Sequence, residues 1–478
     1  MALENSPKSC DQTNSWSDLD AFVATPRLGG LVLSPDGKRL LVSLSSLDGD
    51  KTGYQSAWWS IDPDAAEPSR RLTRSVEGES SAAFLPDSSL LFTSKRATPP
   101  NHDPEADEDA DSVQVLWCLP AGSGEAYVVG RREGGWSGIL TATANERITL
   151  RVPMHRGTND EQQDAAKRKL RKKNKISAIL HESYPIRFWD HDLGPVADRL
   201  ACGDLVADGA DRMLQSTPLT GDIGRALDDA GWSVSADGTR LVIDWSVPRP
   251  GGEIAGTIVS IDTATGDRVT IAEDSADEFA GPVISADGSL VACMRVVEST
   301  ATAAPDTKLW LITAEGSQLL APDWDRWPQP IAFSPDNQTL YVVADDQGNG
   351  PIFAVDIDSG NVRRLTEDGA YSSVLLSADG SSLYAVRASY TDPGTIVAID
   401  TASGKVRELA GPVSYQALPG RLENVETLAA DGATIRGYLL LPDGASAANP
   451  APLALMIHGG PLGSSNCWSW RWCPWLLV

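Results

Sequence analysis

A short phrase recurs along the chain, and it constrains the fold more than any other feature of the sequence. The phrase runs Ser or Leu, Pro or Ala, Asp, a Gly or polar residue, and then an apolar stretch, as in LSPDGKRLLVSL at 33–44. Proline sets φ for a turn, and Asp-Gly tolerates the positive φ of a tight hairpin. Each copy therefore predicts strand, turn, strand. The other copies are FLPDSSLLFTS (84–94), VSADGTRLVIDW (234–245), ISADGSLVACMR (284–295), FSPDNQTLYVVAD (333–345), LSADGSSLYAVRA (376–388) and a degenerate ATANERITLRVP (142–153).

A second kind of hairpin follows these copies. Alternating apolar residues lead into an Asp-rich turn, as in TIVSIDTATGDRVTIA (257–272) and TIVAIDTASGKVRELA (395–410). Alternation with period 2 is typical of half-buried strands. One copy and its partner make four short strands, which is the content of one propeller blade.

The spacing of the turns predicts seven blades. Successive anchors are separated by 51, 58, 92, 50, 49 and 43 residues, and an inserted segment explains the long gap. Single blades cannot bury their apolar faces, so we expect seven of them to share a core across 26–415. The anchors are Asp36, Asp87, Asn145, Asp237, Asp287, Asp336 and Asp379.

Composition excludes several classes of function. The chain has 478 residues with 40 Lys+Arg against 65 Asp+Glu, and its net charge of −25 repels phosphate backbones and anionic lipid. We therefore expect neither nucleic acid nor a membrane as a partner.

The six cysteines form no CxxC pair, and the first twenty residues do not look like a secretory signal, which together favour a cytoplasmic location. Scattered His and Cys predict no metal site, and nothing in the sequence calls for a cofactor. The Asp-rich turn at 356–360 fits a hairpin better than a calcium loop.

Two segments have unusual charge. The segment 101–112 carries six acidic residues, and we expect a solvated loop rather than a cation site. An insertion at about 154–185 ends in the basic stretch 165–182, in which seven of the nine residues from Lys167 to Lys175 are Lys or Arg. A surface helix or loop that pairs with an acidic neighbour is the favoured interpretation, and a nucleic-acid tether is the alternative. The sequence does not assign a role to this stretch.

The pattern changes after Gly420. Two longer strands joined by an Ala-Asp-Gly turn are predicted over 421–444, followed by PLALMIHGGP at 452–461. Because Leu453–Ile457 shows no alternation, it predicts a strand buried on both faces of a parallel sheet. Glycines at the carboxyl end of such a strand let the backbone approach a ligand closely.

A propeller with SPDG hairpins, followed by two strands and HGGP, resembles the prolyl oligopeptidase family of serine peptidases, particularly its acylaminoacyl-peptidase and dipeptidyl-peptidase-like branch. The stretches WSDLDAFVATPRL (16–28), HESYPIRFWDHDLG (181–194) and GGPLGSSNCWSWRWCPWLLV (459–478) are also similar to members of this family. The resemblance implies a mostly β fold: an N-terminal segment (1–25), a seven-bladed β-propeller (26–415), and the first strands of an incomplete α/β-hydrolase domain (416–478).

The resemblance also implies a mechanism and site residues. In the family, a serine on a strand–helix elbow attacks the peptide carbonyl, with histidine as base and aspartate as its orienting group. By position, Gly460 is the expected oxyanion donor, with His458, Gly459 and Pro461 shaping the turn; a simple strand-ending turn is the alternative. Arg187, Trp189, Asp190 and His191 are candidates for lining a chamber that admits short peptides, although a structural role at strand ends fits them equally well.

One departure from the family pattern determines whether we expect this chain to be active. The chain ends at Val478 and contains no G-x-S-x-G elbow, so no catalytic triad can be assigned. We therefore expect a chain truncated before its nucleophile and inactive by itself, with a second chain or a homo-oligomer completing the hydrolase domain. Leu453–Ile457 and four tryptophans (Trp468, Trp470, Trp472 and Trp475) are expected to expose apolar surface. The alternative function is a non-catalytic, TolB-like or WD-type propeller that binds partner proteins.

Overall fold

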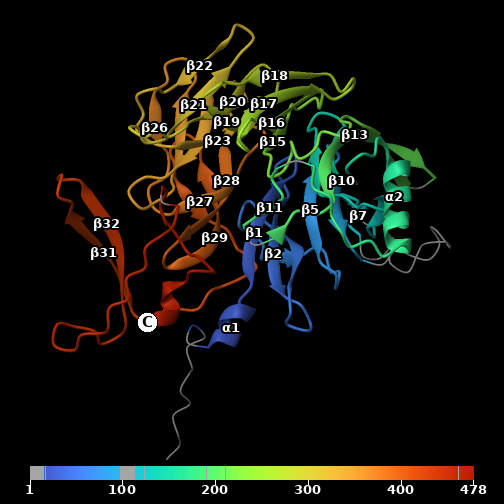
Figure 1. Cartoon of the computed structure of the whole chain (residues 1–478). Helices are drawn as coiled ribbons and strands as arrows, with labels where there is room; N and C mark the ends of the chain where they lie inside the picture. Colours follow the sequence, from blue (N-terminus) through green and yellow to red (C-terminus); the bar gives the residue numbers. More distant parts are fainter. Residues whose placement is uncertain are drawn as a thin grey trace, which may run out of the picture.

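A computed structural model describes residue 16 and residues 18–96, 113–122, 124–182, 184–189, 191–209, 211–460 and 462–478. Most of these form seven four-stranded antiparallel sheets arranged around a central space (Figure 1). The first strands of successive blades contact one another around the whole ring, so they are the innermost strands. The predicted fold class, a mostly β chain with a seven-bladed propeller, is confirmed.

The strands of the first four blades are as follows. Blade one contains β1 (Arg27–Leu33), β2 (Leu40–Leu47), β3 (Tyr54–Ile61) and β4 (Arg70–Arg71). Blade two contains β5 (Glu79–Phe84), β6 (Leu90–Ser94), β7 (Val115–Leu119) and β8 (Tyr127–Gly130). Blade three contains β9 (Gly138–Thr141), β10 (Ile148–His155), β13 (Val196–Asp208) and β14 (Asp211–Pro218). Blade four contains β15 (Trp232–Val234), β16 (Arg240–Pro248), β17 (Ile254–Asp262) and β18 (Arg268–Ala272).

The remaining three blades follow without interruption. Blade five contains β19 (Glu278–Ile284), β20 (Val291–Val297), β21 (Asp306–Ile312) and β22 (Ser317–Leu320). Blade six contains β23 (Pro328–Phe333), β24 (Thr339–Ala344), β25 (Ile352–Asp356) and β26 (Val362–Arg364). Blade seven contains β27 (Ala370–Leu376), β28 (Ser382–Ser389), β29 (Asp392–Asp400) and β30 (Val406–Glu408).

The recurring phrase forms the turn between the first and second strand of each blade, and its hydrogen bonds explain its composition. In blade one the Ser34 hydroxyl donates to the Asp36 carboxylate (2.5 Å), which also accepts from the Lys38 N–H (3.1 Å). The same Ser–Asp bond recurs in blades four to seven. Hydrogen bonds to the ionised form lower the pKa of the aspartate, to about 2 for Asp287. The aspartate is therefore a turn-forming group.

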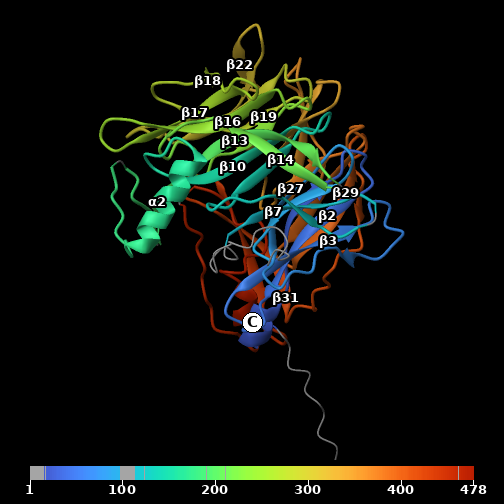
Figure 2. The same ribbon diagram turned by 90° about the vertical axis from the view of Figure 1, so that its right-hand side faces the viewer.

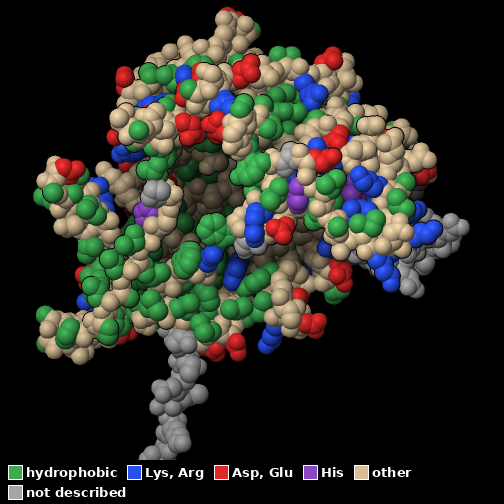
Figure 3. All heavy atoms as spheres, viewed as in Figure 1, with side chains coloured by type: hydrophobic (Ala, Val, Ile, Leu, Met, Phe, Trp, Pro, Cys, Tyr) green, Lys and Arg blue, Asp and Glu red, His purple; other side chains and the backbone are tan. Residues whose placement is uncertain are grey.

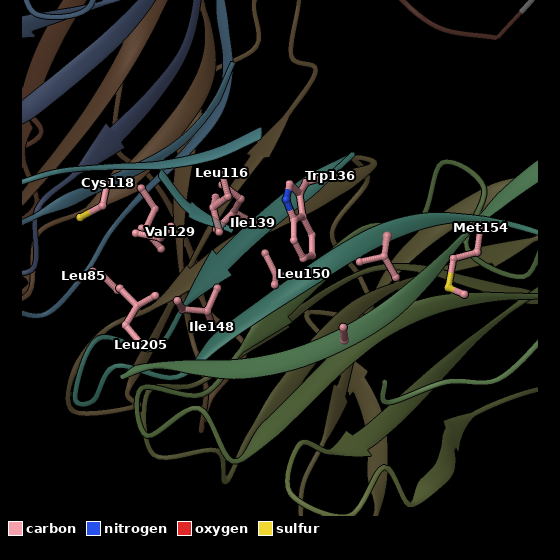
Figure 4. Packing of buried hydrophobic residues seen from close by; sticks show 13 residues of the cluster. Leu85, Leu116, Cys118, Val129, Trp136, Ile139, Ile148, Leu150, Met154 and Leu205 are labelled. Atoms are coloured by element: carbon pink, nitrogen blue, oxygen red, sulfur yellow. The ribbon is translucent and has the colours of Figure 1, made fainter. Parts of the chain in front are cut away.

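The core lies between the blades, in seven apolar clusters that each join two neighbouring blades. The largest joins blades two and three and includes Leu116, Ile139, Leu150 and Trp136 (Figure 4). Blades seven and one close the ring through a cluster that includes Leu40, Ile61 and Ile396. Every blade is built from consecutive strands, apart from the insertion in blade three, so no strand is exchanged at the closure.

The insertion in blade three lies between β10 and β13. It contains α2 (Glu161–Lys173) and a short hairpin of β11 (Arg187–Phe188) and β12 (His191–Asp192). Asp160 caps α2 by accepting from the Gln163 N–H (2.8 Å). The expected basic surface helix is thus present, and Lys169 pairs with the acidic neighbour Glu133 at 3.2 Å. The acidic segment 101–112 lies outside the described residues.

The two ends of the propeller differ. The recurring turns lie at one end, and the connections between second and third strands lie at the other. The insertion in blade three is such a connection, and it projects to the same side as the chain after Gly420 (Figure 2). The segment after Gly420 begins with a hairpin of β31 (Arg421–Leu428) and β32 (Thr434–Leu441) and ends with a 3-10 turn, Pro474–Leu477. At the other end of the chain, α1 (Leu19–Ala24) precedes β1. No helix in the described ranges is long and apolar enough to cross a bilayer.

Candidate functional site

The candidate site is the end of the propeller that faces residues 445–478. Figure 3 looks onto this face, where a hollow opens at the centre and apolar side chains gather on the side of the C-terminal segment. The segment is fixed to the connections of blades six and seven. The Trp468 N–H donates to the Ser389 carbonyl (3.0 Å), and Trp475 Nε1 donates to the Tyr390 carbonyl (2.6 Å). Asn466 Nδ2 donates to the Asp345 carboxylate (2.6 Å).

The predicted buried strand Leu453–Ile457 is wrong. These residues form no strand, and Leu453, Leu455 and Ile457 are 85%, 79% and 81% exposed. An apolar run becomes a central strand only where neighbouring strands can pair with it on both sides. The β31–β32 hairpin pairs only with itself within the described chain, so it supplies no such neighbour.

The expected exposure of the tryptophans is also wrong in part. Trp468 and Trp475 are only 9% and 2% exposed, because they pack in a cluster with Trp16 and Phe22 from the start of the chain. The Trp16 and Trp468 rings are 5.0 Å apart, and the Trp16 indole donates to the Ala417 carbonyl (3.1 Å). Only Trp472 is largely exposed, at 64%. A contact between residues about 450 positions apart has no signature in the local sequence.

The HGG turn lies on the surface of the C-terminal segment. His458 is exposed, with Nδ1 3.1 Å from the Gly459 carbonyl oxygen. Gly460 has a φ of +142°, and a Cβ at this position would lie 2.6 Å from the Leu462 carbonyl oxygen, so the turn requires glycine. The Gly460 N–H donates to no other described residue. It can therefore donate to an incoming oxygen. Pro461 lies outside the described residues.

Among the described residues, no catalytic triad forms around His155 or His458. The buried His155 ring pairs with Asp164 (Nδ1 to Oδ1, 2.9 Å), and no hydroxyl or thiol of the described residues bonds to the ring of His155 or His458. The sequence assigned no triad either.

Three of the four chamber candidates, Arg187, Trp189 and His191, lie together on the β11–β12 hairpin, on the same end of the propeller as the HGG turn. Arg187 faces Asp192 at 3.7 Å, and Trp189 is 85% exposed in the turn with a φ of +46°. His191 is exposed, and Asp190 lies outside the described residues. Whether they line a substrate chamber stays a prediction.

Sequence reasoning missed an acidic pair in blade six. Asp345 and Asp346 follow β24 directly, on the face that carries the C-terminal segment. Burial raises the pKa of Asp345, although Asn466 hydrogen-bonds it, while Asp346 is held between Arg326 (2.7 Å) and Arg364 (2.5 Å). The signal for this pair was two acidic residues directly after an apolar strand, YVVADD.

Burial also perturbs a carboxylate that joins blades four and five. Asp244 on β16 accepts the N–H groups of Gly231 and Gly281, each at 2.9 Å. Burial raises its pKa to about 6, despite these two bonds and the nearby charge of Arg151. The two glycines lie beside β15 and in β19, the innermost strands of the two blades, so Asp244 fixes their spacing.

No protein-family model matches the chain. Among curated proteins it is 24% identical over 499 residues to dipeptidyl-peptidase 5 of Trichophyton schoenleinii, an alignment that covers 95% of this chain and 64% of that protein. Dipeptidyl-peptidase 5 of Trichophyton equinum is 26% identical over 504 residues with the same coverage. The chain thus spans less than two thirds of these relatives.

Solved structures share the fold. An acylaminoacyl peptidase of Pyrococcus horikoshii matches with a TM-score of 0.65 at 14% identity, covering 93% of this chain and 62% of that one. The β-propeller domain of the Trilobed protease from Pyrococcus furiosus, described as an open velcro topology, matches with a TM-score of 0.52 at 10% identity, covering 80% of this chain and 95% of that one. These solved structures share the propeller fold with this chain. The comparisons confirm the resemblance of this chain to the prolyl oligopeptidase family of serine peptidases.

Proposed function

We propose that this chain is the propeller and oxyanion-side part of a cytoplasmic serine peptidase that hydrolyses short peptides. The observation that carries the proposal is the position of the HGG turn. A glycine whose N–H bonds to no other residue of the described ranges is held on the propeller end that carries the hollow, in a segment anchored by Trp468 and Trp475. A backbone N–H that is already in place stabilises a developing oxyanion without reorganisation. The free cysteines of the described chain support a reducing compartment.

The nucleophile belongs, in this proposal, to polypeptide that these 478 residues do not include, on the same chain or a second one. The exposed apolar run 453–457 supports this, since pairing with further strands would cover it. The proposal also assigns the propeller the role of a cover that admits short peptides and excludes folded proteins.

Two measurements test the proposal. The purified 478-residue chain is assayed on dipeptidyl and N-acetylaminoacyl amides and with a fluorophosphonate probe; we expect neither turnover nor labelling. An antibody to the propeller is then used to isolate the protein from its source cell. We expect labelled serine either in a species heavier than 50.9 kDa or in a partner that co-purifies. An unlabelled species at 50.9 kDa with no such partner would contradict the proposal and favour a binding propeller.

A further inference from the structure

The insertion in blade three is the most unusual surface of the molecule, because it exposes both basic and large apolar side chains. Between 161 and 192 there are eight Lys+Arg and five Asp+Glu, in a chain whose net charge is −25. Six large apolar side chains are exposed in the described residues of 174–189, and Leu180, Tyr184 and Trp189 are 83%, 60% and 85% exposed. The other three are Ile176, Ile179 and Ile186. Such a concentration marks an interaction surface.

Hydrogen bonds attach α2 to blade three and to the residues that follow the helix. Lys167 donates to the Arg156 carbonyl (2.5 Å), and Arg168 bonds to the buried Asp164 (2.7 Å). Arg171 donates to the Ala178 carbonyl (2.8 Å), which fixes the chain that follows the helix. Lys167, Arg168 and Arg171 thus bond within the protein. Lys169, Lys172, Lys173 and Lys175 are exposed, and Lys173 and Lys175 form no ion pair with the described residues. Figure 3 shows Lys and Arg gathered where α2 lies.

We propose that α2 and the described residues of 174–189 form a docking surface for a short acidic peptide that also carries apolar side chains. Cations of α2 attract the carboxylates, and the exposed side chains around Leu180 and Trp189 bind the apolar groups. The negative charge and small size of such a peptide favour it over larger polyanions. Charges are screened within about 8–10 Å at physiological salt, so a short peptide senses mainly the basic surface near it. A nucleic acid or a membrane extends over the acidic remainder of the molecule and is repelled. The inference does not depend on peptidase activity; under the proposed function the bound peptide is the substrate.

The test is equilibrium binding of a fluorescent decapeptide of alternating Glu and Leu to the 478-residue chain, followed by anisotropy. We expect binding that weakens between 50 and 300 mM salt, and at least tenfold weaker binding when Gln or Lys replaces Glu in the peptide. The double variant Lys173→Glu/Lys175→Glu should bind at least tenfold more weakly. Lys38→Glu/Lys405→Glu changes the net charge equally at the opposite end and should stay within twofold of the unaltered chain.

The apolar part is tested separately. Leu180→Ser/Trp189→Ser should weaken binding at least fivefold with an unchanged salt dependence, whereas Val76→Ser/Val269→Ser, at exposed sites elsewhere, should not. All these side chains are exposed, and thermal unfolding checks that each variant folds. Three results would overturn the inference: no peptide binding, tighter binding of a ten-nucleotide single strand or of anionic vesicles, or binding that appears only after the acidic residues between 103 and 111 are made neutral. The last result would identify that segment of the chain as the occupant. Because binding is measured without turnover, failure here leaves the proposed function intact, and the reverse also holds.

Discussion

Gly460 is a residue whose backbone, rather than its side chain, carries the proposed chemistry. Its φ of +142° and the 2.6 Å gap between an added Cβ and the Leu462 oxygen leave no room for alanine without a shift of the turn. In the active species isolated with the antibody, Gly460→Ala should lower kcat by about 10²–10³, the usual cost of losing an oxyanion donor. Gly459→Ala is the matched control, because an added Cβ there meets nothing within 4 Å. Equal kcat values for the two variants would remove Gly460 from the proposed site.

Asp244 shows how one buried carboxylate makes stability depend on pH. Its pKa rises from 3.8 to about 6 on folding, so between these values the folded chain holds a proton that the unfolded chain has lost. Stability from this group is therefore fully present below pH 3.8 and falls as the pH rises through 6, by at most about 3 kcal/mol.

The measurement is urea unfolding of the unaltered chain and of Asp244→Asn between pH 4 and 7.5. Asparagine does not titrate, and its amide nitrogen faces one of the glycine N–H groups, so the variant should be about 1–3 kcal/mol less stable at pH 4. The difference between the two proteins should shrink as the pH rises. A difference that is constant with pH would show that Asp244 does not titrate in this window.

At the scale of elements, α2 is attached to blade three through one buried carboxylate. Asp164 is 1% exposed and accepts from the His155 N–H (2.8 Å), His155 Nδ1 (2.9 Å) and Arg168 Nε (2.7 Å), with Arg132 at 3.7 Å. Burial opposes ionisation of Asp164, but the bonds from His155 and Arg168 outweigh it and lower the pKa. Because folding lowers this pKa, the stabilisation is complete above the unfolded value of 3.8 and is lost as the pH falls through the folded value.

Asp164→Ala should therefore release the helix. It leaves the buried Arg132 with only the exposed Glu161 as an ion-pair partner, and removing one partner of a buried ion pair costs about 3–5 kcal/mol. We expect hydrogen exchange measured by mass spectrometry to accelerate in 156–186 and to stay unchanged in blades five to seven. Glu161→Ala, which removes a partner of Arg132 that is 62% exposed, is the control and should have little effect. Acceleration spread over all blades would show that Asp164 supports the whole propeller instead.

The short blade turns and the C-terminal segment show which parts of the structure the sequence could predict. A blade turn is encoded within six residues: the Ser34 hydroxyl and the Asp36 carboxylate bond to each other and to the Lys38 and Arg39 N–H groups. Seven such local signals predicted the ring. The run 453–457 has the composition of a buried strand, but its burial depends on partners that no local pattern specifies. The burial of Trp468 and Trp475 depends on packing against Trp16, which lies near the other end of the chain. The Asp345–Asn466 hydrogen bond likewise joins residues 121 positions apart. The site was therefore predicted as a motif, without its attachment to blades six and seven.

At the scale of the whole molecule, the ring closes without strand exchange, so the junction of blades seven and one depends on side chains. Arg407 donates to the Pro63 carbonyl (2.7 Å) across this junction, and the apolar cluster that includes Leu40 and Ile396 lies beside it. Arg39 makes an equivalent bond to the Ser88 carbonyl (2.7 Å), but blades one and two are also joined by the chain. The same hydrogen bond should therefore matter more at the junction that lacks this covalent link.

Arg407→Ala tests this closure, with Arg39→Ala as the matched control. Each loses one bond from a charged donor, about 1.5–3 kcal/mol. In Arg39→Ala, blades one and two remain joined by the chain even where they separate, so the opening stays local. In Arg407→Ala the two ends can separate, and we expect faster hydrogen exchange in β1 and β27 together, with earlier cleavage near both by dilute protease. Acceleration confined to β30 would mean that the apolar cluster closes the ring by itself, and equal effects of the two variants would mean that the chain connection adds nothing to closure.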